Sequence, residues 1–367
     1  MTPMSLIKPM KTERLQWLDA MRGLTMILVV GYHVAQMSFG VNEKTSSSLP
    51  FLVLFRMPLF FFVSGFLAYK ADFLWTWSNA LSLTWKKIKI QVLPTTVFLC
   101  AFIILRRPEF WGAMEYALKS PTKMGYWFTW VLLHMFIIYY AACLLQRIMS
   151  HKTNGVNGTS GSSHVVIWVL FGLSLMAYET LYLPSISYYK EPFFRYSSLV
   201  KTINFLPFFL LGNLAHRYWN KVQKVAISSC FFLLLTIVAF ISCADIFRWH
   251  FCKAEWVNLP RTIAIFSLLS MVVIFFQNYQ EWFTREHVVG RSLQYIGVRT
   301  LDIYLLHYIL LPKIPQVGVW LNANRPNFVL EIVMSFSMAL VVIAFCLLIS
   351  QILRVSPLFR QYLFGRK

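Results

Sequence analysis

The chain has 367 residues, of which 58% are hydrophobic and only 13% are charged, and its formal net charge is +20. Soluble proteins average about 45–50% apolar and about 25% charged residues, so the composition excludes both a water-soluble fold and a disordered chain. In a hydrophilic protein the positive charge would suggest nucleic acid binding. In a chain this apolar we assign it to membrane topology, and we expect no nucleic acid partner.

Ten stretches along the chain have the length and polarity of membrane-spanning helices. Such a helix needs about 20 mostly apolar residues, because about 30 Å of hydrocarbon is crossed at about 1.5 Å per residue. The sequence therefore predicts an all-α, polytopic membrane protein. In chain order the ten predicted spans are Trp17–Phe39, Pro50–Tyr69, Ile88–Leu105, Gly125–Ile148, His164–Leu183, Leu199–Tyr218, Val225–Phe247, Thr262–Gln280, Leu293–Pro312 and Phe328–Leu353.

The lysine and arginine residues of the short loops predict the orientation. Loops rich in these residues are retained in the cytoplasm, and the clusters are larger on the side of the N-terminus. With ten spans, both termini are then cytoplasmic. We expect a cytoplasmic N-terminal segment at residues 1–14, a transmembrane domain at residues 15–353 and a cytoplasmic tail at residues 354–367.

The loops on the opposite side are also basic, at Arg106, Arg107, Lys119 and Lys123. These cations could face an anionic glycan or the headgroups of the lipids. The sequence alone leaves both readings open.

Glycine, serine and asparagine dominate residues 151–163, which predicts a flexible cytoplasmic linker between two blocks of helices. Cys100, Cys143, Cys230 and Cys346 fall inside predicted spans, where cysteine packs as a small apolar residue. Cys243 and Cys252 flank one outer segment, and the sequence does not decide whether they pair. Because no cysteine or histidine has the spacing of metal ligands, we expect no metal site.

The first span carries the most informative pair of polar residues. Arg22 and His33 are eleven residues apart, which places them on one helix face and about 16 Å apart along the axis. An arginine at the membrane surface can hold a phosphate, and a deeper histidine can accept a proton. The same spacing also fits a structural Asp19–Arg22 pair together with a His33 that bonds a neighbouring helix.

Other polar residues at membrane depth are costly to insert, so each is a candidate for function. In the second span, Arg56 either snorkels to the interface or points into a cavity with Glu179 of the fifth span. The Ser64-Gly65 pair allows close approach of another helix. In the ninth span, His307 has one tyrosine three residues before it, Tyr304, and another directly after it, Tyr308. A tyrosine could satisfy the imidazole in a purely structural role.

Five segments, in matching order, resemble the acyltransferase 3 family of integral-membrane acyltransferases. The first is LDAMRGLTMILVVGYHV, which keeps the spacing of an arginine and a histidine in the family's opening motif as Arg22 and His33. The others are RMPLFFFVSGFLAYK, YWFTWVLL, LPFFLLGNLA and LQYIGVRTLDIYLLHYILL. Together they extend over nearly the whole chain.

The resemblance implies transfer of an acyl group, acetyl first of all, from acyl-coenzyme A (acyl-CoA) to a hydroxyl of a sugar, a cell-surface glycan or a glycan precursor. It also implies a bacterial inner membrane, acyl-CoA as a donor substrate rather than a bound cofactor, and polysaccharide-synthesis machinery as a further partner. Arg22 and Asp19 would bind coenzyme A, and Arg22 and His33 would be catalytic. The residues expected to line the substrate cavity are Arg56, Ser64, Glu179, Tyr304 and His307.

The segment of the fourth span, YWFTWVLL, departs from the family pattern, because many members carry a glutamate in this stretch where this chain offers Thr129 and His134. A rival hypothesis is a transporter or flippase that moves a glycan or a lipid-linked sugar without covalent chemistry, with the intramembrane Arg and His as substrate sites. The sequence favours no particular acceptor, acyl chain length or oligomeric state. It leaves direct transfer and an acyl-histidine intermediate equally open.

Overall fold

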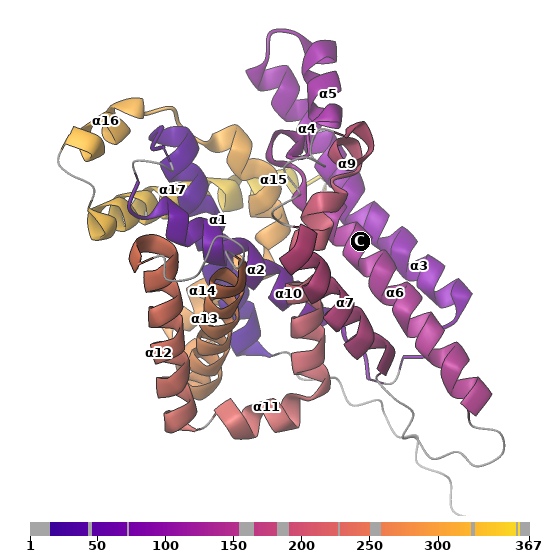
Figure 1. Ribbon diagram of the computed structural model, residues 1–367. Helices are drawn as coiled ribbons and strands as arrows, with labels where there is room; N and C mark the ends of the chain where they lie inside the picture. The colour runs from indigo at the N-terminus through magenta and orange to yellow at the C-terminus, as the bar shows by residue number, and fades with distance from the viewer. Residues whose placement is uncertain are drawn as a thin grey trace, which may run out of the picture.

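The computed structural model describes residues 15–42, 46–71, 73–153, 165–181, 191–226, 228–249, 258–323, 327–356 and 359. Within these residues every regular element is a helix and no strand occurs, which confirms the all-α prediction (Figure 1). The main helices are α1 (Gln16–His33), α2 (Leu49–Ala68), α3 (Trp77–Lys87), α4 (Leu93–Arg106), α5 (Phe110–Lys119), α6 (Phe128–Thr153), α7 (Val165–Leu181), α9 (Pro192–Ser197), α10 (Leu199–Arg217), α11 (Trp219–Ala226), α12 (Ser229–Ala244), α13 (Asn258–Asn278), α14 (Val288–Val298), α15 (Thr300–Leu310), α16 (Pro315–Ala323) and α17 (Phe328–Leu353).

Seven continuous helical segments in the described part of the chain are long and apolar enough to cross a membrane. Two shorter apolar helices, α7 and α15, accompany them. The chain is therefore a multi-pass membrane protein, as predicted, whereas ten spans and two cytoplasmic termini stay predictions. The seven segments are Gln16–Ser38, Leu49–Ala68, Trp77–Arg106, Phe128–Ser150, Ser229–Phe247, Asn258–Asn278 and Phe328–Leu353.

The helix boundaries differ from the predicted spans in two places. The predicted span at Leu293–Pro312 consists of two helices, because the backbone leaves helical geometry at Arg299 (φ −111°, ψ 20°). This break lets α15 begin with Thr300, which contacts α1. The predicted span at Ile88–Leu105 is the second half of a longer helix that starts at Trp77 and passes through a π-helical turn.

Two sequence features lie partly or wholly outside the described residues. Helix α6 continues to Thr153, so the first part of the predicted linker at residues 151–163 is helical, and the rest lies outside the described residues. Cys252 also lies outside them, and so therefore does its pairing with Cys243.

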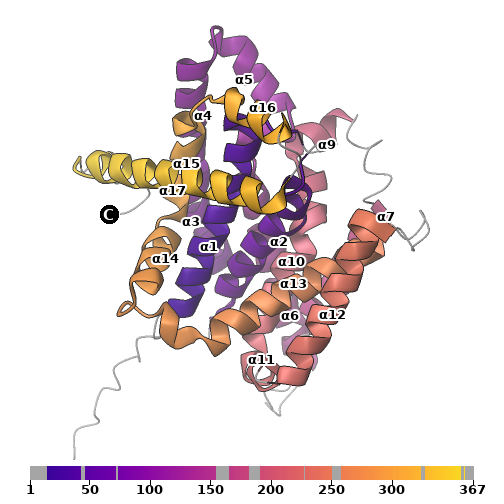
Figure 2. The same ribbon diagram turned by 90° about the vertical axis from the view of Figure 1, so that its left-hand side faces the viewer.

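Helix α1 occupies the centre of the bundle and packs against α2, α14, α15 and α17. Helix α17 runs across α1 and α15 at a steep angle (Figure 2). Near its end, Arg354 binds both carboxylate oxygens of Asp302 (2.6 and 2.8 Å), and Ser350 donates to the same carboxylate (2.7 Å). Near its start, Glu331 accepts a hydrogen bond from the Ser46 hydroxyl (2.6 Å). These contacts join α17 to α15 at one end and to the segment before α2 at the other.

Four glycines let two pairs of helices approach unusually closely. Gly23 of α1 lies against α14, which carries Gly297, and Gly65 of α2 lies against α10, which carries Gly212. A Cβ atom at any of the four would sit only 1.8–2.0 Å from a main-chain oxygen of the partner helix. Each crossing therefore requires glycine on both sides. All four lie in segments that carry the family resemblance.

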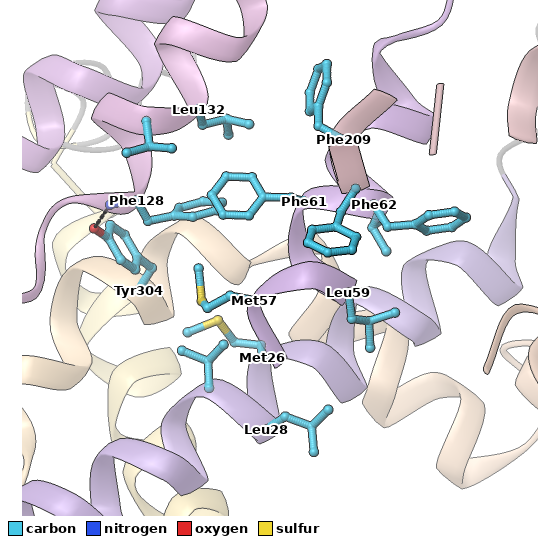
Figure 3. Close-up of a cluster of buried hydrophobic side chains, with 14 of the residues drawn as sticks. Met26, Leu28, Met57, Leu59, Phe61, Phe62, Phe128, Leu132, Phe209 and Tyr304 are labelled. Atoms are coloured by element: carbon cyan, nitrogen blue, oxygen red, sulfur yellow. Dashed lines mark hydrogen bonds between the residues drawn. The ribbon is translucent and has the colours of Figure 1, made fainter. Parts of the chain in front are cut away.

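The core between α1, α2, α6 and α15 is apolar and rich in sulfur and aromatic rings (Figure 3). Met26 of α1 and Met57 of α2 lie near Phe128 and Tyr304 in this view. The Phe128 backbone N–H donates to the Tyr304 hydroxyl (3.3 Å), which joins the start of α6 to α15. This packing sets the position of the polar residues described next.

Candidate functional site

His33 is the last residue of α1, and only one of its two imidazole nitrogens has a hydrogen-bond partner among the described residues. A hydrogen bond of 2.9 Å joins its Nε2 to the Tyr308 hydroxyl on α15. Its Nδ1 is buried and makes no hydrogen bond within the described part of the chain. When Nε2 carries the proton and donates it to Tyr308, Nδ1 keeps its lone pair and can act as a base.

His307 lies behind His33, with the two ring centroids 5.4 Å apart. It is fully buried, and its Nδ1 lies 3.0 Å from the Ile303 carbonyl oxygen, to which it must donate because a carbonyl only accepts. Within the described part of the chain neither the Tyr304 nor the Tyr308 hydroxyl bonds the His307 imidazole, so the structure does not show the tyrosine-satisfied histidine of the structural reading. The Tyr304 hydroxyl instead lies 3.3 Å from the Gly125 carbonyl and holds the turn before α6.

Arg22 lies on α1 at the other end from His33 and points toward the break between α14 and α15. Its guanidinium donates to Asp19 (3.3 Å) and to the Thr300 hydroxyl (3.1 Å). About a quarter of the Arg22 side chain is exposed (27%), against 9% for Asp19. Asp19 therefore orients Arg22, while part of the guanidinium stays open to a ligand.

A first cavity, which we call the Arg22 cavity, has a volume of about 180 Å³. Arg22, Ser64, Lys87 and Tyr304 contribute to its wall. The Lys87 ammonium lies 3.8 Å from the centroid of the Phe136 ring. Lys87 belongs to a cluster of lysines whose positive charge the sequence explains by membrane topology, so the sequence predicts no role for it in a site.

A second and larger cavity, the Arg56 cavity, has a volume of about 540 Å³ and contains His33 in its wall. Arg56 lies over the Tyr32 ring at 3.1 Å from its centroid, so its charge faces an aromatic surface. Lys201 and Tyr308 also line the cavity. Sequence reasoning missed Lys201, for which the only signal was a lysine inside the apolar stretch of α10.

A narrow passage of about 30 Å³ separates the two cavities. It shares Phe60, Phe128 and Tyr304 with the Arg22 cavity, and His33 and Arg56 with the Arg56 cavity. His33 thus lies where the two cavities approach each other. Arg22 and His33 serve different cavities, although they lie on one helix.

Of the expected cavity residues, Ser64 lines the Arg22 cavity, whereas Glu179 does not line the Arg56 cavity. The Ser64 hydroxyl donates to the Phe60 carbonyl of its own helix (2.9 Å) and lines the Arg22 cavity. The Glu179 carboxylate accepts a hydrogen bond from the Thr262 hydroxyl, and Glu179 is not among the residues that line the Arg56 cavity. Glu179 thereby joins α7 to α13.

The turn before α6 packs against Tyr308, the tyrosine that is hydrogen-bonded to His33. Lys123, Met124 and Gly125 all have positive φ (47°, 52° and 102°), and a Cβ on Gly125 would lie 2.3 Å from the Tyr308 ring. The Lys123 ammonium donates to the Tyr196 carbonyl (2.8 Å), and burial lowers the pKa of Lys123 from its ordinary value. The turn therefore needs glycine at its end, where the backbone meets Tyr308.

Comparison with known proteins finds one matching family. A family model described as an acyltransferase domain matches residues 15–354, which is nearly the whole chain. No curated protein and no solved structure matches the chain. The matched range contains every residue described above, from Arg22 and His33 on α1 to His307 and Tyr308 on α15.

Proposed function

The chain belongs to the acyltransferase 3 family of membrane acyltransferases, and from this premise we propose that it transfers an acyl group, acetyl first, from acyl-CoA to a hydroxyl of a glycan or glycan precursor. The observation that carries the proposal is the position of His33 at the passage between two separate cavities. One cavity can take the donor and the other the acceptor, so that the reacting groups meet at the imidazole.

The Arg22 cavity suits the donor. Arg22 and Lys87 provide two cations beside a pocket that narrows toward the passage, and guanidinium groups bind phosphates in a bidentate way. Asp19 holds the Arg22 guanidinium in place through its hydrogen bond. With the N-terminus in the cytoplasm, this cavity opens to the cytoplasmic pool of acyl-CoA, and the thioester end points toward His33.

The Arg56 cavity then holds the acceptor. His33 Nδ1 takes the proton of the acceptor hydroxyl while the oxygen attacks the thioester carbonyl. The carbon–sulfur bond breaks, the new ester bond forms, and the proton passes to the thiolate of coenzyme A. Tyr308 fixes the orientation of His33, and His307 packs behind it. In an alternative order, His33 carries the acyl group between the two substrates.

The test uses His33→Ala and Arg22→Ala in membranes supplied with labelled acetyl-CoA, with the acetylation of cell-surface glycans measured by mass spectrometry. We expect His33→Ala to abolish glycan acetylation. Arg22→Ala should weaken coenzyme A binding in calorimetry while the fold is retained. The matched control is His134→Ala, because His134 also lies inside a span, where it bonds Thr202 (3.0 Å), and it lines neither cavity.

Acetylation that continues in a normally expressed His33→Ala variant would remove the catalytic role of His33. Transport gives a different result from transfer. If unmodified glycan crossed liposomes that contain the purified protein, without dependence on acyl-CoA and without a covalent product, the proposal of transfer would fail.

A further inference from the structure

The Arg56 cavity has a strongly one-sided charge. Its wall contains four cationic side chains from four separate parts of the chain, namely Arg56 on α2, Arg107 at the end of α4, Lys201 on α10 and Arg261 on α13. Among the described residues that line it, none is an aspartate or a glutamate. The whole chain has 14 such acids for 34 lysines and arginines, so the excess of positive over negative side chains is larger in this wall than in the chain as a whole.

Lys201 is one of these cations and has no ion pair within the described part of the chain. Its ammonium lies 4.4 Å from the centroid of the Trp127 ring. Arg56 lines the same cavity, so the two positive charges repel each other. An anion placed between them would remove that repulsion.

The same cavity also has aromatic side chains in its wall. Trp127 and Phe205 stack on each other, with ring centroids 5.7 Å apart, so their faces are largely covered. Tyr116 and Tyr178 of the wall provide apolar ring surface together with hydroxyls, and Asn204 adds an amide for the hydroxyls of a sugar. Cations next to aromatic rings fit a sugar that bears negative charge better than a neutral sugar.

We propose that the Arg56 cavity selects an acceptor sugar that carries a carboxylate or a phosphate, and that Lys201 pairs with this charge. The proposal rests on the proposed function for the identity of the cavity as the acceptor site. Binding alone, measured without acyl-CoA, is sufficient to test it. A failure of transfer and a failure of charge selection are therefore separate results.

The experiment compares two probes that differ in one group, p-nitrophenyl β-glucoside and p-nitrophenyl β-glucuronide, on the purified full-length protein in neutral detergent. We expect the glucuronide to bind at least tenfold more tightly than the glucoside. The preference should fall at least threefold between 0.05 and 0.5 M NaCl, because salt screens charges in a hydrated cavity. The 6-phosphate of the glucoside should bind as tightly as the glucuronide. Equal binding of the glucoside and the glucuronide would overturn the proposal.

The variants assign the preference to Lys201. Lys201→Gln should reduce the ratio of the two affinities to about one, while Lys201→Arg, which keeps the charge and guards against a folding defect, should retain most of it. Lys313→Gln is the matched control, because Lys313 is exposed and does not line the cavity. A ratio unchanged in Lys201→Gln, or lost equally in Lys201→Arg, would remove the role of Lys201.

An anionic phospholipid headgroup carries the same chemistry as the proposed acceptor. The binding assay is therefore repeated with phosphatidylglycerol and with phosphatidylcholine in the micelles. If phosphatidylglycerol alone abolished glucuronide binding, the cations would belong to a lipid site, and the proposal of an acidic acceptor would be wrong. Glucuronide binding that persists in both lipids supports it.

Discussion

Replacing Tyr308 with phenylalanine tests whether the hydrogen bond to His33 supports catalysis. The variant removes the hydroxyl that bonds the imidazole, at 2.9 Å from Nε2, and keeps the ring that packs on His307 and on Gly125. A buried N–H group that loses its partner costs about 1–3 kcal/mol. At about 1.36 kcal/mol for each tenfold change in rate, kcat should fall about 5- to 150-fold.

The prediction also separates kcat from KM. Tyr308 lines the Arg56 cavity and the passage but not the Arg22 cavity, so KM for acyl-CoA should stay within about twofold of the wild-type value. The assay is the initial rate of transfer from labelled acetyl-CoA to the glycan fraction of the membranes, with the amount of folded protein determined by size-exclusion chromatography.

Tyr126→Phe is the control for the loss of a buried tyrosine hydroxyl. Tyr126 donates to the Leu305 carbonyl (2.9 Å), and its ring centroid lies 5.3 Å from that of Tyr308, but it makes no hydrogen bond to His33. Its removal should lower thermal stability and leave kcat nearly unchanged. A folded Tyr308→Phe protein with wild-type kcat, or an equal loss of kcat in Tyr126→Phe, would refute the reasoning.

Two further predictions concern the helix contacts that position the site, and both are measured by thermal unfolding in detergent. Gly297→Ala should lower Tm strongly or prevent folding, because its Cβ would lie 1.8 Å from the Asp19 carbonyl oxygen. The control is Gly172→Ala, whose Cβ would meet no atom within 4 Å, and which should be neutral or stabilising by up to about 1 kcal/mol. Equal Tm values for the two variants would contradict the close crossing of α1 and α14. Asp302→Asn should destabilise by about 3–5 kcal/mol, because it leaves Arg354 buried without its carboxylate, and combining it with Arg354→Met should restore part of the loss. A double variant less stable than the single one would contradict this account.

The sequence predicted those parts of the site that lie on a single helix. Helical periodicity was sufficient to place Arg22 and His33 on one face of α1, and the structure keeps them there. The contact between His33 and Tyr308 could not be predicted, because it depends on how α15 crosses α1. Lys87 was missed for a similar reason, since its burial against a ring of α6 depends on packing between helices.

The fold, too, was predictable where it depends on neighbouring residues in the sequence and not where it depends on contacts between distant segments. Apolar length predicted an all-helical membrane protein, because hydrocarbon thickness sets the length of a span. The break at Arg299 was not foreseen, since apolar residues on both sides make the segment read as one helix. The two halves pack against different parts of the protein: Gly297 of α14 packs against α1, and Asp302 of α15 pairs with Arg354.

The narrow passage beside His33 has a consequence for the electrical barrier of the membrane. A volume of about 30 Å³ admits only one or two water molecules, so the two cavities approach each other without a wide path for ions. Moving one elementary charge across a membrane potential costs about 2.3 kcal/mol for every 100 mV. Under the proposed function, an uncharged acyl group would pass between the cavities without this electrical work, whereas the phosphates of the donor and a charged sugar would each stay on their own side.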